Sequence, residues 1–323
     1  MDTQAIGATQ SGLQDKFVDA GGMSVHYLHA GTGRPLVLIH GLVGSAFNWR
    51  RNMQALAGDA SVYAVDLVNM GSSQRVPGLD PSLAATADRL AAWMDALGIA
   101  QADIAAHSHG GAVALMLAAR HPERVRGLIL FAPANPYSNA GDMLIRIYST
   151  GFGRRLARIG PYLPRRAQLF MLGRMYGNPK RIVLETLDGY VAGGRIPGTI
   201  DHVLGIVRGW HTEMAALKAI LPSIAHLPTL LIWGDRDRAV TVASGLRLHR
   251  DLPGSELMVV PGGGHLVFQE LPEETNQAMR AWLARSQDAA SRPARVRMLE
   301  PRSAPPPARS PISSNLQHLS PGL

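Results

Sequence analysis

The residues around Ser108 have types and spacing that suit nucleophilic chemistry. In residues 103–111 (DIAAHSHGG) a short apolar stretch leads into a small-x-Ser-x-Gly turn, and an apolar run at helical spacing follows. A serine at the apex of such a strand-turn-helix unit takes a strained backbone conformation, so its neighbours in the turn must be small. Ala106 and Gly110 meet that requirement. The pattern therefore predicts that Ser108 is a nucleophile rather than an ordinary surface serine.

An acid and a histidine follow two later apolar runs. Asp237 stands in a Gly-Asp-x-Asp turn after the run 227–233, and His265 follows three glycines after the run 257–260. A histidine can take the proton of a serine hydroxyl during attack and return it to the leaving group. An acid beside the histidine holds the required tautomer and stabilises the imidazolium that forms. Ser108, Asp237 and His265 are therefore a candidate catalytic triad.

Two alternatives remain open around this triad. Asp235 lies two residues before Asp237, and strand alternation would put both side chains on a similar side if the strand ran through the turn. We interpret Asp235 as a turn residue without excluding it as the acid. His107 and His109 flank the serine, and a His-x-His pair also occurs in metal sites. No carboxylate or cysteine cluster of ligand spacing accompanies the pair, so we favour pocket or packing roles and expect no metal.

Residues 15–285 resemble the α/β-hydrolase family, in its serine-nucleophile branch of esterases and lipases. The serine turn, the chain order Ser, acid, His and the run 35–41 (PLVLIHG) carry the resemblance. It implies that Asp237 is the acid, because the family's pattern after that strand is Gly-x-x-Asp. It also implies that the backbone N–H groups of Leu42 and His109 form an oxyanion hole, and that the reaction needs no cofactor.

One turn departs from the family's pattern. Residues 62–73 resemble the family's Asp-x-Pro-Gly-x-Gly-x-Ser turn, but Val68 and Asn69 replace the Pro-Gly pair. Asparagine adopts a positive φ more readily than other residues that carry a Cβ atom. We therefore expect the turn to persist and the fold to be unaffected.

Local patterns also predict the elements that position the triad. The hydrophobic periodicity and the turn residues predict a hairpin over 17–29 and a helix over 81–97. They also predict the sixth strand over 125–131. The helix after Ser108 is expected to end near His121, because Pro122 cannot continue it.

The alternation of strands with helices predicts one α/β domain, doubly wound, with a mostly parallel eight-stranded sheet. The alternation of strands and helices stops at Ala134, where the resemblance implies a helical cap inserted after strand six. The tail is rich in Pro, Ser, Ala and Arg, a composition typical of disorder. We therefore expect a disordered N-terminus over 1–14 and a core made of 15–133 and 228–285. A cap is expected over about 134–227, and a disordered tail over 286–323.

Positive charge is concentrated in the predicted cap. The chain has a formal net charge of +8, and residues 134–227 hold twelve Arg and Lys against five Asp and Glu. Seven arginines and no acid lie between Leu144 and Tyr176. We favour a solvated face on helices whose other face covers the pocket. The alternative is a cap that rests on anionic lipid or receives an acidic substrate. No nucleic-acid-binding module accompanies the charge, so no nucleic-acid partner is expected.

Composition further narrows the classes of protein to which the chain can belong. A chain of 323 residues with 46% hydrophobic content can bury a large core, and the lack of cysteine excludes disulfides and a thiol nucleophile. Without a long apolar run or a signal-peptide pattern, we expect a cytoplasmic protein. The predicted function is a serine hydrolase that cleaves a carboxylic ester or related acyl bond in an apolar small molecule. Acyl transfer and carbon-carbon bond hydrolysis on the same triad are alternatives. A non-catalytic ligand-binding protein is a third.

Overall fold

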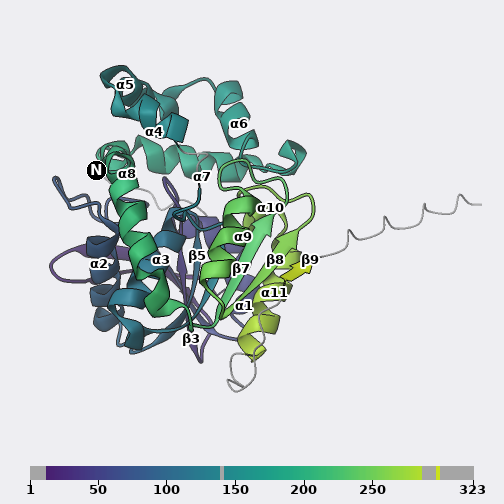
Figure 1. The fold of residues 1–323 in the computed structure, drawn as a ribbon. Coiled ribbons are helices and arrows are strands. Elements are labelled where there is room, and N and C mark those ends of the chain that lie inside the picture. The colour runs from purple at the N-terminus through teal and green to yellow at the C-terminus, as the bar shows by residue number, and fades with distance from the viewer. Residues whose placement is uncertain (1–11, 139–141, 286–295, 299–323) are drawn as a thin grey trace, which may run out of the picture.

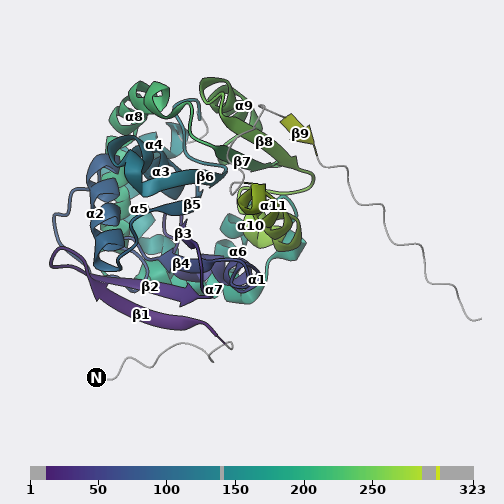
Figure 2. The same ribbon diagram turned by 90° about the horizontal axis from the view of Figure 1, so that it is seen from below.

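The computed structural model describes residues 12–138, 142–285 and 296–298, which form a twisted sheet with helices on both faces (Figures 1 and 2). Within these residues the sheet has nine strands in the order β1-β2-β4-β3-β5-β6-β7-β8-β9. The first two strands pair antiparallel, β2 pairs antiparallel with β4, and all later pairs are parallel. The strands are β1 (Gln14–Asp19), β2 (Ser24–Ala30), β3 (Pro35–Ile39), β4 (Ser61–Val65), β5 (Ala102–His107), β6 (Val125–Phe131), β7 (Thr229–Gly234), β8 (Ser255–Val260) and β9 (Val296–Met298).

Helices connect the parallel strands and cover the sheet. They are α1 (Arg50–Leu56), α2 (Leu83–Ala96), α3 (His109–Arg120), α4 (Asp142–Ser149), α5 (Gly151–Ile159), α6 (Arg165–Gly173), α7 (Leu184–Arg195), α8 (Thr199–Ile220), α9 (Val242–Asp251), α10 (Val267–Glu270) and α11 (Pro272–Arg285). Side chains alternate along each strand, so Val37 and Ile39 of β3 enter one core, with α2 and α3, while Leu36 and Leu38 enter the other, with α1 and α11. Parallel strands covered on both faces explain why these runs are continuously apolar.

The predicted fold class is confirmed. The turn after β4, in which Val68 and Asn69 replace a Pro-Gly pair, also persists as expected. Asn69 has a φ of 69°. Its side-chain oxygen accepts the N–H of Val76 at 2.6 Å, and its amide donates to the carbonyl of the same residue at 3.1 Å. The asparagine thus bridges the turn that a Pro-Gly pair usually makes, because it tolerates a left-handed backbone and supplies both a donor and an acceptor.

Most predicted elements are present, with small shifts at their ends. The hairpin is β1 with β2, and its turn contains Gly21 and Gly22 at φ of 64° and 79°. Helix α2 begins after Ser82, whose side chain accepts the N–H of Ala85 at 3.2 Å. Helix α3 ends at Arg120, before the proline that was expected to stop it.

Two boundaries were predicted wrongly. The N-terminal segment expected to be disordered included Gln14, which instead begins β1 because it pairs with His29 of β2. The tail expected to be disordered contains β9, which pairs in parallel with residues 257–259 of β8 and adds a ninth strand to the predicted eight. A β-ladder supplies hydrogen bonds that composition does not reveal. The rest of both segments, residues 1–11, 286–295 and 299–323, lies outside the described residues.

Helices α4 to α8 lie between β6 and β7 in the chain, and we call residues 142–220 the inserted segment. Figure 1 shows α4, α5, α6 and α7 gathered above one end of the sheet, while α8 runs down beside α3. The segment contacts a loop that follows a strand, because the N–H of Leu266, after β8, donates to the carbonyl of Met175 at 3.3 Å. No helix in the described part of the chain is both long and apolar enough to span a bilayer.

Candidate active site

Ser108 lies in a tight turn between β5 and α3. Its φ is 52°, in the left-handed region that is strained for a residue with a Cβ atom. A Cβ atom on Gly110 would collide with the carbonyl oxygen of His40, and one on Gly111 would lie 2.5 Å from the Cβ atom of Pro133. Glycine at both positions therefore lets the helix start directly after the serine, which presents Ser108 at the carboxyl end of a central strand.

His265 lies between Ser108 and Asp237. Its Nε2 is 3.0 Å from the Oγ of Ser108, and its Nδ1 is 2.8 Å from Oδ2 of Asp237. The second carboxylate oxygen of Asp237 accepts the N–H groups of Ala239 and Val240 at 2.8 and 2.9 Å. Because the carboxylate accepts from Nδ1–H, Nε2 of the neutral ring is left to accept the serine proton. The three side chains have the geometry that the predicted nucleophile, base and orienting acid require.

The side chain of Asp235 points to a different partner from that of Asp237. Its Oδ1 accepts the N–H of Gly262 at 2.7 Å, and the residue is exposed to solvent. This bond ties the turn after β7 to the loop after β8 that carries His265. The structure therefore brings Asp237, and not Asp235, into contact with the histidine.

The two histidines beside the serine are buried and have different surroundings. His107 donates from Nε2 to the carbonyl of His265 at 3.1 Å, and its ring centroid lies 4.6 Å from that of His265. Burial, with the nearby His265, holds the pKa of His107 well below its ordinary value. Burial also lowers the pKa of His109 to about 3. Both rings are neutral, and His107 supports the loop of His265.

The loop after β3 lies against the serine. A Cβ atom on Gly41 would be 3.1 Å from the Cβ atom of Ser108, which shows how close the two backbones are. The next residue is Leu42, and His109 is the first residue of α3. Among the described residues, neither backbone N–H has a hydrogen-bond partner. Two N–H donors without a partner, one in the loop that lies against Ser108 and one directly after Ser108, are the kind of groups that an oxyanion hole requires.

His40 fixes the shape of this loop. It is fully buried, its Nδ1 donates to the carbonyl of Gly41 at 2.8 Å, and its Nε2 accepts the N–H of Leu67 at 3.1 Å. Since a backbone N–H can only donate, the ring must be the neutral Nδ1–H tautomer, and burial lowers its pKa in agreement. His40 therefore joins the loop that carries Leu42 to the loop after β4.

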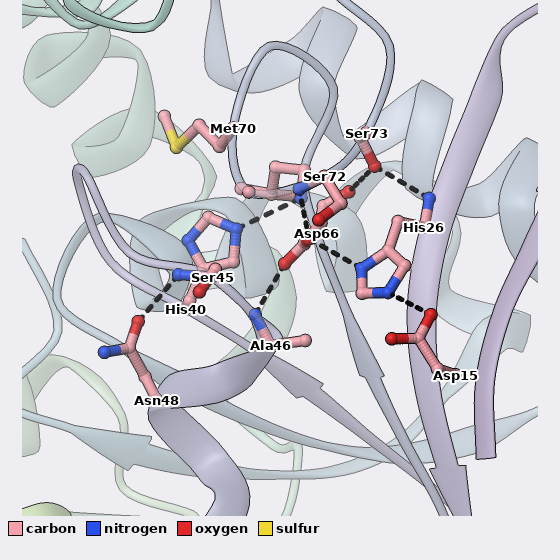
Figure 3. Close-up of polar contacts among 12 residues, drawn as sticks. Asp15, His26, His40, Ser45, Ala46, Asn48, Asp66, Met70, Ser72 and Ser73 are labelled. Atoms are coloured by element: carbon pink, nitrogen blue, oxygen red, sulfur yellow. Dashed lines mark hydrogen bonds and ion pairs between the residues drawn. The ribbon is translucent and has the colours of Figure 1, made fainter. Parts of the chain in front are cut away.

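Asp66 makes the second connection between these two loops (Figure 3). Its carboxylate accepts the N–H of Ala46 at 2.5 Å and the N–H of Ser72 at 2.6 Å. A third bond comes from Nδ1 of His26 at 2.7 Å. Gly71 lies so close that a Cβ atom there would collide with the carboxylate. The buried acid is thus saturated with donors and holds the loop after β3 against the loop after β4.

His26 is paired with two acids. Its Nδ1 donates to the buried Asp66, and its Nε2 donates to the exposed Asp15 at 2.8 Å, so both ring nitrogens carry protons. Burial alone would lower the pKa of His26, but the hydrogen bonds and charges of the two acids raise it above its ordinary value. Burial alone would raise the pKa of Asp66, but His26 and further donors lower it.

Glu270 connects the inserted segment to the loop of His265. Its side chain is buried, and its two oxygens accept the N–H groups of Gly177, Asn178 and Gly264 at 2.9, 2.8 and 2.8 Å. Arg181 adds an ion pair at 3.0 Å. A Cβ atom on Gly264 would collide with the N–H of Gly177, so the two glycines permit this contact.

Sequence reasoning missed the positioning residues His40, Asp66 and Glu270. His40 and Asp66 stand in the quoted runs 35–41 and 62–73, so those runs were the available signal. Glu270 has no such signal, because its partners at Gly177 and Asn178 are about ninety residues away in the chain.

The fold agrees with the family comparison. The sequence profile described as "alpha/beta hydrolase fold" matches residues 34–272, and the chain belongs to this family. A curated relative is the dihydrolipoyllysine-residue acetyltransferase component of the acetoin cleaving system of Pseudomonas putida, 31% identical over 284 residues, which cover 86% of this chain and 71% of the relative. Another is the 2-hydroxymuconate semialdehyde hydrolase of Pseudomonas sp. (strain CF600), 29% identical over 255 residues, with 76% and 85% covered.

Two solved structures illustrate the likeness in three dimensions. One is a membrane phospholipase A, described as a bacterial virulence factor, with a TM-score of 0.71 and 26% identity, covering 86% of this chain and 87% of that one. The other is a meta-cleavage product hydrolase from Pseudomonas fluorescens IP01, with a TM-score of 0.69 and 24% identity, covering 84% and 98%. The second shows the fold alone.

Proposed function

We propose that this chain is a serine hydrolase that cleaves a carboxylic ester or a related acyl bond through an acyl-serine intermediate. The observation that carries the proposal is the continuous hydrogen-bonded series from Oγ of Ser108 through the His265 ring to Asp237, at 3.0 and 2.8 Å. Three side chains from the ends of three strands meet in the order that general-base activation of a serine requires.

The proposed reaction has two halves. His265 takes the proton of Ser108 as Oγ attacks the substrate carbonyl, and the carbonyl oxygen becomes an oxyanion that the N–H groups of Leu42 and His109 stabilise. The protonated His265 then gives its proton to the leaving alcohol, and the acyl group remains on the serine. In the second half the same ring takes a proton from water, whose oxygen attacks the acyl carbon, and then returns that proton to Oγ as the acid is released.

The proposed substrate is an apolar small molecule. His109, whose N–H is one of the two proposed oxyanion donors, lines a hollow formed by apolar Val65, Leu67, Met70 and Trp93 together with polar Asp66, Arg89 and His202. The residues that line this hollow do not include Ser108. We propose further that the core comprises residues 15–133 and 228–285, and that residues 134–227 act as a cap over the site. The anchoring of Gly177 by Glu270 beside the His265 loop supports that role.

Two alternative reactions use the same groups. Acyl transfer needs an alcohol, amine or thiol in place of the second water. Hydrolysis of a carbon-carbon bond needs a substrate whose leaving carbon is stabilised as an enolate. The names of the relatives from Pseudomonas, an acetyltransferase component and a semialdehyde hydrolase, favour keeping both alternatives. A non-catalytic ligand-binding role is less well supported, because it has no need for a free oxyanion site beside a complete triad.

A substrate series separates these reactions. Purified protein is assayed with p-nitrophenyl esters of increasing acyl length, with and without a competing alcohol, and with a 2-hydroxy-6-oxodienoate. Release of p-nitrophenol together with free acid, lost in Ser108→Ala, is the expected result. Ester formation with the alcohol at the expense of free acid would assign acyl transfer, and turnover of the dienoate alone would assign carbon-carbon cleavage.

A further inference from the structure

The outer face of α5 exposes large apolar side chains. Phe152, Leu156 and Ile159 are 78%, 43% and 53% exposed. They stand at positions i, i+4 and i+7, so they form one stripe along the helix. The sequence favoured a solvated face on cap helices whose other face covers the pocket. On α5 the solvent-exposed side carries this apolar stripe as well as arginine.

The exposure continues along the next two elements and is concentrated in the inserted segment. Nine of the eleven exposed large hydrophobic residues of the described chain lie in that segment. After α5, the 3-10 turn Gly160–Tyr162 exposes Tyr162 at 63%, and α6 exposes Phe170 at 68% and Met171 at 49%. We call Phe152, Leu156, Ile159, Tyr162, Phe170 and Met171 the outer apolar surface. Single exposed apolar residues are ordinary on a protein surface, whereas their concentration in one segment calls for an explanation.

Positive charge accompanies this surface. The seven arginines between residues 144 and 176 have no acid among them in sequence. Two of them pair with exposed acids of neighbouring helices, Arg158 with Asp201 at 2.6 Å and Arg165 with Asp188 at 2.8 Å. Over residues 134–227 the twelve Arg and Lys outnumber the five Asp and Glu, so the net charge of this region is positive. Arginine side chains can lie along an apolar surface with their charged ends directed outward, so the two features suit one partner.

The charge decides which partner fits. A second copy of this chain would place the same arginines opposite each other, and like charges repel across an interface. A lipid layer with anionic headgroups offers negative charge at its surface and acyl chains directly below, which match the arginines and the apolar stripe in turn. We infer that α5, the turn Gly160–Tyr162 and α6 form a docking surface for an anionic lipid layer.

The location links docking to the proposed reaction, on which this part of the inference rests. Figure 1 shows α5 and α6 on the side of the inserted segment that faces away from the sheet. The same segment contacts the loop of His265 through Glu270 and Gly177, and His265 bonds Ser108. A docked lipid layer therefore lies on the same side of the molecule as the serine. Esters with long acyl chains dissolve in such a layer, and they are the substrate class that this geometry favours.

The test measures vesicle binding by the full chain. Wild type is sedimented with vesicles of phosphatidylcholine alone and with vesicles that contain phosphatidylglycerol, at low and high salt. We expect binding to the anionic vesicles that salt weakens. The variant Phe152→Ser with Ile159→Ser should lose about tenfold in partition coefficient for each side chain replaced. Arg155→Gln with Arg166→Gln should lose about fivefold for each charge.

Matched controls keep the result interpretable. Phe17→Ser removes a 57% exposed apolar side chain on β1, far from the inserted segment in the chain, and should bind vesicles as wild type does. Thermal unfolding of every variant checks that it is folded. Equal vesicle binding by wild type and the Phe152→Ser, Ile159→Ser variant would overturn the inference. So would a dimer, seen by sedimentation velocity, that this variant abolishes. Ser108→Ala should bind vesicles as wild type does, because vesicle binding does not depend on the reaction. The docking test therefore stands even if the proposed reaction proves wrong.

Discussion

Nε2 of His265 lies 3.0 Å from Oγ of Ser108, although 157 residues separate the two in the chain. The sheet brings them together, because Ser108 follows β5 and His265 follows β8, and parallel strands end at the same edge. Each loop is then fixed by its own contacts. The serine is held by glycines in its turn, and the histidine loop is held by Asp235, Asp237 and Glu270.

The two aspartates near His265 should differ in their effect on catalysis. Asp237→Asn should lower kcat by roughly four orders of magnitude, because the amide no longer holds the required tautomer of the ring. Asp235→Asn should lower kcat far less, since the carboxylate of Asp235 accepts the N–H of Gly262 rather than bonding the His265 ring. Steady-state kinetics on one p-nitrophenyl ester compares the pair. A larger loss of kcat in Asp235→Asn would show that the acid has been misassigned.

His40 should act on catalysis through the loop that it positions. His40→Ala removes the bridge between the Gly41 carbonyl and the Leu67 N–H, so the Leu42 donor is no longer held beside the serine. We expect kcat to fall about 10²-fold to 10³-fold, with a smaller change in KM, as when one oxyanion donor is lost. A half-buried histidine on β2 gives the control His29→Ala. If His40→Ala lowers Tm but leaves kcat unchanged, the residue has a structural role alone.

Glu270 should be the main anchor between the inserted segment and the core. Glu270→Gln places an amide where three backbone N–H groups and Arg181 require acceptors, which leaves buried donors unpaired. We expect a loss of about 2–4 kcal/mol in the free energy of unfolding. The exposed Glu273→Gln on α11 is the matched control and should cost almost nothing. Urea denaturation provides the comparison, and equal midpoints for the two variants would contradict the assignment.

The pair of His26 and Asp66 predicts how stability depends on pH. The pKa of His26 is raised above its ordinary value of 6.5, so its contribution is complete below pH 6.5 and is lost as pH rises through the raised value. The pKa of Asp66 is lowered from 3.8, so its contribution is complete above that pH and is lost as pH falls through the lowered value. The stability that the pair supplies is therefore largest between those two ordinary values.

Urea unfolding of wild type and His26→Gln tests this dependence. The wild type should lose stability relative to the variant as pH rises above 6.5, because the unfolded histidine is already neutral there and the folded one must give up its proton. A difference between the two proteins that stays constant from pH 5 to 9 would contradict the pairing.

Sequence patterns were sufficient where a local rule governs the outcome. The small residues around Ser108, the proline after His121 and the asparagine at position 69 each restrict the backbone directly, so strand, turn and helix boundaries followed. Contacts such as Glu270 with Gly177 depend on packing between distant segments, which no local pattern encodes. The exposed apolar stripe of α5 was not predicted either, because the side of a helix that meets solvent depends on how the helix packs.

The central claim is that Ser108 is an activated nucleophile, and covalent labelling tests it most directly. A fluorophosphonate probe should attach to the wild-type protein at one site, and peptide mass spectrometry should place the adduct on Ser108. Ser108→Ala should show neither labelling nor ester turnover, with a thermal unfolding midpoint close to that of wild type. Labelling of another residue, or ester turnover that persists in purified Ser108→Ala, would contradict the proposed mechanism.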